Sequence, residues 1–121
     1  MNSLLREATS KSPFVTFDPK SGVLELKGRS IPENALDFYK PLMEWIDDWT
    51  LTQPEKTELH VQLEYFNTSS SKCLLDLFKR LEKLGAKALV VWKYETDDED
   101  MLEAGEDYEA ILSVPFEMKE V

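Results

Sequence analysis

ELHVQLEYFNTSSSKCLLDLFKRLEKLG, residues 58–85, changes its hydrophobic period within a few positions. The first part alternates between apolar and polar side chains, which is typical of a β-strand with one covered face. Its apolar face consists of Leu59, Val61, Leu63 and Tyr65, and its polar face of His60, Gln62 and Glu64. From Cys73 onward the apolar side chains recur at helical spacing, and Gly85 is suited to end the helix. The stretch therefore predicts a strand that is followed by an amphipathic helix.

The preceding and following segments predict further strands and helices. Residues 14–28 contain two strand-like runs around PKSG, which favours a β-hairpin. Residues 35–49 have apolar side chains at helical spacing, and we expect Pro41 to bend or divide this helix. Residues 87–95 are strand-like because of their Val, Trp and Tyr content.

The last part of the chain begins with acidic residues and ends in a strand-like run. Residues 96–112 indicate an acidic loop and a weak helix that Gly105 interrupts, and residues 113–121 indicate a last strand. Helices and strands thus alternate, and only one face of the strand at 58–66 looks covered. We therefore expect an α/β fold, a two-layer sandwich in which a mixed β-sheet carries helices mainly on one face.

Composition limits the setting and the partners of the protein. The chain has 121 residues, 42% of them hydrophobic, so a single domain spanning residues 1–121 can bury a core. Residues 1–12 are polar, unlike a signal peptide, and are expected to be a flexible segment. No apolar run is long enough for a membrane span, and a single cysteine agrees with a cytoplasmic location. The net charge of -10 argues against binding to nucleic acids or anionic membranes.

No pattern of catalytic or metal-binding residues stands out. His60 lies on the polar face of its strand, and the thiol of Cys73 falls on a helix, where small buried thiols are common. Asp97–Asp100 lack the ligand spacing of a calcium loop, and acidic side chains are favoured at a helix start in any case. We expect no catalytic residue, no metal and no cofactor, with a small enzyme based on Cys73 or His60 as a rival interpretation.

The hydroxyl block Thr68–Ser71 supplies more hydroxyls than one helix cap requires. Asn67 or Thr68 can be the N-cap, because both side chains accept hydrogen bonds from the free amides of a first helical turn. The same helix start suits a phosphoryl group on Thr68, since free N–H groups and the helix dipole favour an anion. Lys72, one turn later, can reach such a group. On these residues alone, capping and phosphorylation both stay open.

Three separated motifs resemble a known family. They are GRSIPENALDFYKPL at 28–42, LEYFNTSSSKCLLDL at 63–77 and DDEDMLEAGEDY at 97–108, and they are similar to the SiaC family of bacterial regulatory phosphoproteins. The resemblance runs from about the first hairpin to the C-terminus and leaves out the first dozen residues. It implies an architecture similar to that of anti-sigma-factor antagonists, a STAS-like fold.

The resemblance also implies a function in partner switching. It implies that a SiaB-like protein kinase phosphorylates the protein and that a SiaA-like protein phosphatase reverses this. The unphosphorylated form is expected to bind and activate a SiaD-like diguanylate cyclase, which raises cyclic di-GMP and promotes biofilm formation. The phosphorylated threonine of the family corresponds to Thr68. An anti-sigma-factor antagonist that controls transcription is the alternative, because it would use the same switch.

The resemblance describes a regulatory protein rather than an enzyme. We expect the surround of the phosphosite to comprise Asn67, Ser69, Ser70 and Lys72, and the partner surface to include Tyr65, Phe66 and Ser71. The sequence also allows Arg29, Ser30 and Asn34 to form a second polar cluster, and a role at a helix start is an equal alternative for them.

Overall fold

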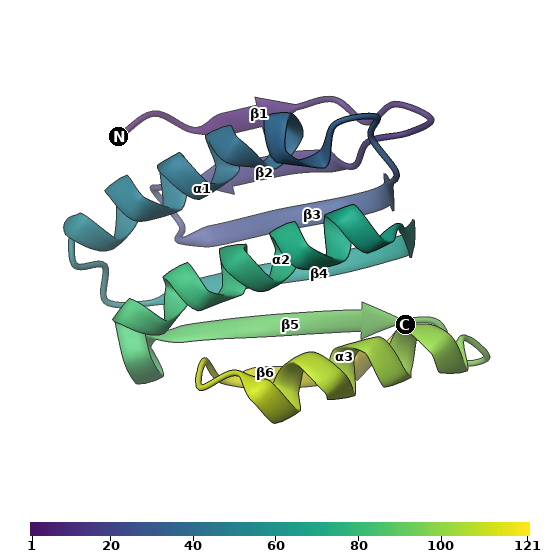
Figure 1. The fold of residues 1–121 in the computed structure, drawn as a ribbon. Helices are drawn as coiled ribbons and strands as arrows, with labels where there is room; N and C mark the ends of the chain where they lie inside the picture. The colour runs from purple at the N-terminus through teal and green to yellow at the C-terminus, as the bar shows by residue number, and fades with distance from the viewer.

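A computed structural model describes residues 1–121 and contains one six-stranded sheet with three α-helices (Figure 1). The strands are β1 (Leu4–Arg6), β2 (Phe14–Asp18), β3 (Val23–Ser30), β4 (Thr57–Phe66), β5 (Ala88–Tyr94) and β6 (Phe116–Glu120). The helices are α1 (Ala35–Leu51), α2 (Thr68–Leu81) and α3 (Glu99–Ile111), and a 3₁₀ segment, η1 (Glu82–Lys87), follows α2. None of the helices is long and apolar enough to cross a membrane.

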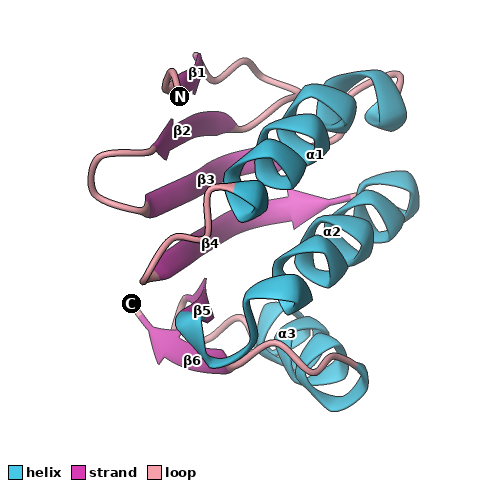
Figure 2. Cartoon of the chain, turned by 90° about the vertical axis from the view of Figure 1, so that its left-hand side faces the viewer, coloured by secondary structure: helices cyan, strands magenta, loops and turns pink.

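The order of the strands explains why all helices lie on one face. The strands lie in the sheet in the order in which they occur in the chain, with β1, β2 and β3 antiparallel and β3 to β6 parallel. Connections between parallel strands are right-handed, so three crossovers that step in the same direction place α1, α2 and α3 on the same face. Figure 2 shows the helices together on one side of the sheet. The predicted two-layer α/β arrangement with a mixed sheet is confirmed.

The core fills the space between the helices and the covered face of the sheet. It contains 25 buried residues, and the predicted alternation in β4 holds for Leu59, Val61 and Leu63. Trp92 on β5 is fully buried and lies edge-on to the ring of Phe78 on α2. Helix α1 is continuous across Pro41 and is therefore not divided there.

Two features of the chain differ from the sequence-based expectation. The polar composition of residues 1–12 predicts a flexible segment, whereas Leu4–Arg6 pair with β2 as an edge strand, and Trp45 Nε1 donates a hydrogen bond to the carbonyl oxygen of Asn2 at 2.8 Å. Gly105 does not interrupt α3. It is buried against Trp92, where a Cβ atom would collide with the indole ring, so the glycine allows a close approach of helix and sheet.

Candidate functional site

The helix start that follows β4 is capped by Asn67. Its side-chain Oδ1 accepts a hydrogen bond from the N–H of Ser70 at 2.9 Å, and its carbonyl oxygen accepts one from the N–H of Ser71 at 2.9 Å. Thr68 is the first residue of α2 and makes no side-chain hydrogen bond. Of the two possible caps, Asn67 has that role. The N–H groups of Thr68 and Ser69 have no acceptor within the helix, so they stay available to an anion.

The four hydroxyls of the block fall into two pairs. Thr68 and Ser69 are exposed, whereas Ser70 is fully buried and Ser71 is half-buried. An enzyme that modifies the folded protein can reach only the first pair. Sequence spacing alone does not separate these hydroxyls, because all four lie in one uninterrupted run.

Ser70 belongs to a buried chain of hydroxyl groups. Its Oγ donates to the carbonyl oxygen of Ser30 at 2.9 Å and accepts from Ser30 Oγ at 2.9 Å. The Tyr39 hydroxyl lies 2.6 Å from Ser30 Oγ, and it must donate there because Ser30 uses its only proton on Ser70. Burial raises the pKa of Tyr39 well above its ordinary value, although the hydrogen bond with Ser30 opposes this. The phenol is therefore held in its neutral, donating form.

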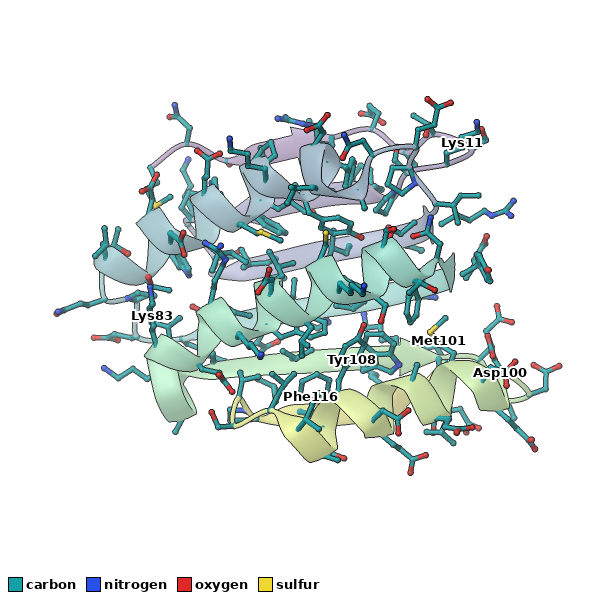
Figure 3. The ribbon with its side chains drawn as sticks, viewed as in Figure 1. Lys11, Lys83, Asp100, Met101, Tyr108 and Phe116 are labelled. Atoms are coloured by element: carbon teal, nitrogen blue, oxygen red, sulfur yellow. The ribbon has the colours of Figure 1, made fainter.

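Ser71 is engaged by a different helix. The Tyr108 hydroxyl donates to the carbonyl oxygen of Ser71 at 2.9 Å, and Ser71 Oγ lies 3.0 Å from the same hydroxyl. Figure 3 shows Tyr108 reaching from α3 toward the sheet and α2. Burial raises the pKa of Tyr108 above its ordinary value. Since its hydroxyl is already bonded within the fold, Ser71 joins α2 to α3, which makes it a poor candidate for direct contact with a partner.

A bulge at the end of β4 changes which aromatic side chain faces the core. Gly28 pairs with Leu63 and Arg29 pairs with Tyr65, so Glu64 is an extra residue in β4. The bulge shifts the alternation by one position. Tyr65 is 56% exposed, although its spacing placed it on the apolar face. Phe66 instead packs against the core, with its ring centroid 6.1 Å from that of Trp92.

The charge around this helix start differs from that at the other two helices. The first turns of α1 and α3 carry acidic residues, whereas the first turn of α2 carries none. Lys72 is exposed one turn into the helix. A groove of about 390 Å³ lies between the starts of α1 and α2 and is lined by Ser69, Lys72 and Leu36 among others. The first turn of α2 therefore adds no acidic side chain against an anion, while Glu33 and Asp76 also line the groove.

The candidates for a catalytic or metal site, His60, Cys73 and Asp98, have the following contacts in the fold. His60 Nε2 lies 3.0 Å from Glu58 Oε1, and its Nδ1 is buried without a partner. Cys73 is buried in α2, and burial raises the pKa of its thiol, which keeps it in the less reactive protonated form. No three His, Cys, Asp or Glu side chains are placed to hold a metal ion. Asp98 caps α3, where its Oδ1 accepts from the N–H of Met101 at 3.0 Å.

The second polar cluster separates into unrelated positions. Ser30 is fully buried, while Arg29 is exposed. Asn34 caps α1, with its Oδ1 accepting from the N–H of Asp37 at 3.2 Å, which agrees with a role at a helix start. Ser30 is thus a hydrogen-bond partner of Ser70 on α2. No sequence signal marks this role, nor that of Tyr39, because both residues follow ordinary strand and helix patterns.

The sequence and the fold of this chain are similar to those of a known family. The family model described as "SiaC family regulatory phosphoprotein" matches residues 6–121. This chain belongs to the SiaC family. The match begins within β1, so the family pattern includes part of the first dozen residues, which the motif resemblance left out.

Relatives of the SiaC family have been solved in two states. The structure of apo-SiaC from Pseudomonas aeruginosa is 28% identical, covers 98% of this chain and 99% of its own, and has a TM-score of 0.89. A second structure is that of the diguanylate cyclase SiaD "in complex with its activator SiaC", also from Pseudomonas aeruginosa. The matched chain is 28% identical, the match covers 98% of this chain and 99% of that chain, and the TM-score is 0.91. An uncharacterized Pseudomonas aeruginosa protein is 29% identical over 119 residues, which are 96% of this chain and 94% of that protein.

Proposed function

We propose that this protein is a non-enzymatic regulatory phosphoprotein of a bacterial partner-switching system, and that its unphosphorylated form binds and activates a diguanylate cyclase. The support is family membership together with the likeness to a SiaC that is solved as the activator of SiaD. In this role it acts in the cytoplasm, raises cyclic di-GMP and promotes biofilm formation. The observation that carries the proposal is an exposed Thr68 at the start of α2, free of hydrogen bonds within the fold.

Thr68 is the proposed acceptor of the phosphoryl group. A SiaB-like kinase transfers the γ-phosphoryl group of ATP: a bond forms between Thr68 Oγ1 and phosphorus, the bond to the bridging oxygen of ADP breaks, and a base of the kinase takes the hydroxyl proton. A SiaA-like phosphatase reverses the modification with water, which attacks phosphorus and releases inorganic phosphate and the free hydroxyl. Both steps leave the backbone of α2 in place.

The helix start suits the phosphorylated state as well as the unmodified one. The free N–H groups of Thr68 and Ser69 and the positive end of the helix dipole favour an anion, and Lys72 adds a cation. Thr68 has no internal hydrogen bond to lose on modification. Phosphate therefore changes the charge and shape of the surface while the fold is kept, which a switch between partners requires.

Of the three residues that we expect at the partner surface, Tyr65, Phe66 and Ser71, only Tyr65 is exposed. Tyr65 is the exposed large aromatic residue nearest to Thr68 in the chain, whereas Phe66 and Ser71 are held inside the fold. Exposed aromatic residues frequently act as anchors in protein interfaces. We assign Tyr65, Ser69 and Lys72 to the surface that meets the cyclase, with Phe66 and Ser71 supporting it from below.

The proposal is tested by phosphorylation in vitro. The protein is incubated with its kinase and ATP, and the modified residue is located by mass spectrometry in the wild type, in Thr68→Ala and in Thr68→Ser. We expect one phosphate on residue 68 in the wild type and in Thr68→Ser, its removal by the phosphatase, and none there in Thr68→Ala. Phosphate on another residue of the wild type would contradict the assignment.

A pull-down from cells separates the proposed function from the alternative. Unphosphorylated protein is expected to retain a diguanylate cyclase. Capture of an anti-sigma factor instead would support an antagonist that acts in transcription.

A further inference from the structure

We propose that Tyr39, Ser30 and Ser70 are positioning residues for phosphoryl transfer: their buried hydroxyl chain holds the first turn of α2 so that Thr68 is presented to the kinase. This inference rests on the proposed function. It adds a part of the site that lies beneath the surface and comes from three elements, namely β3, α1 and α2.

The chain of hydroxyls has a single direction. Tyr39 donates to Ser30, Ser30 donates to Ser70, and Ser70 donates to the carbonyl oxygen of Ser30. All three residues have no exposed surface. Water cannot replace these bonds. Loss of the Ser30 or Ser70 hydroxyl therefore leaves its donor without an acceptor, and loss of the Tyr39 hydroxyl removes the bond that Ser30 Oγ accepts.

The chain ends on an oxygen that also holds the helix cap. The carbonyl oxygen of Ser30 accepts from the N–H of Asn67 at 3.1 Å and from Ser70 Oγ at 2.9 Å. The residue before the helix and its third residue are therefore tied to the same point at the end of β3. Thr68 and Ser69 lie between these two ties. Their backbone cannot shift without breaking one of them.

A fixed helix start matters for the reaction. Helix ends commonly fray, and a hydroxyl that moves relative to the γ-phosphoryl group of ATP spends less time in reach of it. A purely structural role would lower stability and leave the kinetics of the folded protein unchanged. The positioning role predicts instead a lower kcat for Thr68, with little change in KM, because the exposed surface that docks on the kinase is intact.

Two variants remove separate members of the chain. Tyr39→Phe deletes the first donor and keeps the ring, and Ser70→Ala deletes the last donor. In the steady-state kinase assay we expect each to lower kcat by roughly tenfold, because small misplacements of a reacting group slow the step. Combining the two should cost little more than either alone, since both act through one chain.

Thr57→Val is the matched control. Thr57 is also buried and accepts a hydrogen bond from Trp49 Nε1 at 2.9 Å, but it begins β4, whereas the phosphosite follows the end of that strand. We expect it to lower the melting temperature and to leave kcat unchanged. Circular dichroism shows which variants are folded. Amide exchange of Asn67 and Ser70, whose N–H groups are hydrogen-bonded to Ser30 O and Asn67 Oδ1, should become faster in the two chain variants alone.

The outcomes separate the two proposals. If folded Tyr39→Phe or folded Ser70→Ala is phosphorylated with the kcat of the wild type, the positioning role is wrong. It is also wrong if Thr57→Val loses as much kcat as these two variants do. A wild-type protein that takes no phosphate on Thr68 would refute the proposed function itself.

Discussion

Tyr65 and Phe66 are adjacent in β4, yet Tyr65 is 56% exposed while the ring of Phe66 lies edge-on to buried Trp92, with centroids 6.1 Å apart. The bulge at Glu64 causes this reversal, and bulges are frequent next to functional sites. It places an aromatic side chain at the surface three residues before Thr68. We interpret the bulge as the feature that makes Tyr65 available to a partner.

We expect alanine at Tyr65 to affect binding of the cyclase, and alanine at Phe66 to affect the stability of the fold. Tyr65→Ala should weaken binding of the cyclase by at least about tenfold and change the free energy of unfolding by less than about 0.5 kcal/mol. Phe66→Ala should cost about 2 kcal/mol of stability through lost packing. Urea unfolding and a binding titration check both. If Tyr65→Ala binds like the wild type, Tyr65 is not part of the interface.

The assignment of Asn67 as the cap predicts a second pair of effects. Asn67→Ala should lower the free energy of unfolding by about 1 kcal/mol, because the N–H of Ser70 loses its acceptor. Thr68→Ala should change it by less than about 0.5 kcal/mol, since the Thr68 side chain is exposed and unbonded. Urea denaturation measures both. The reverse order would mean that Thr68 is the cap.

Tyr39 predicts a loss of stability at alkaline pH. Burial raises the pKa of Tyr39 in the folded protein above its ordinary value of 10.0, so the unfolded chain releases this proton first. The protonated Tyr39 phenol contributes to the free energy of unfolding in full at a pH below its pKa in the unfolded chain. This contribution is lost as the pH rises toward its pKa in the folded protein, by up to about 1.4 kcal/mol per pH unit. Urea unfolding above the unfolded pKa should show a shallower decline for Tyr39→Phe than for the wild type. Equal slopes would contradict the buried, neutral phenol.

We expect alanine at position 105 to destabilise the protein, although alanine forms helices more readily than glycine. Alanine is favoured over glycine in helices by about 1 kcal/mol, but a Cβ here collides with the Trp92 ring and the methyl group of Met118. We expect Gly105→Ala to lower the free energy of unfolding by about 1–3 kcal/mol and to alter tryptophan fluorescence. Glu106→Ala, on the exposed side of the helix, is the control. A stabilised Gly105→Ala would show that the helix can move away from the sheet.

The strands and helices with clear periodicity could be predicted from the sequence. Residues 58–85 predict β4 and the following helix because their apolar side chains face one layer of the core. Strand β1 could not be predicted, since Leu4–Arg6 are only three residues and gain their pairing from β2. The role of Gly105 depends on Trp92, which is distant in the sequence.

The site could be predicted in part. A run of hydroxyls after a strand indicates a helix start, and family resemblance directs attention to Thr68. Sequence does not reveal which hydroxyls are buried, because Ser70 is held by Ser30, 40 residues away, and Ser71 by Tyr108, 37 residues away. The bulge adds a residue to β4, so the alternation of apolar and polar side chains does not continue past Glu64. Tyr65 is therefore exposed and Phe66 packs against the core, the reverse of what the alternation predicts.

The most direct test of the switch is a titration of the cyclase with two forms of the protein, unmodified and phosphorylated on Thr68, with Thr68→Ala as the uncharged control. The unmodified protein and Thr68→Ala should bind and activate the cyclase equally. The phosphorylated form should bind more than about tenfold more weakly, a loss of at least about 1.4 kcal/mol, because charge enters a contact that excludes water. Equal binding by the phosphorylated and unmodified forms would contradict the account.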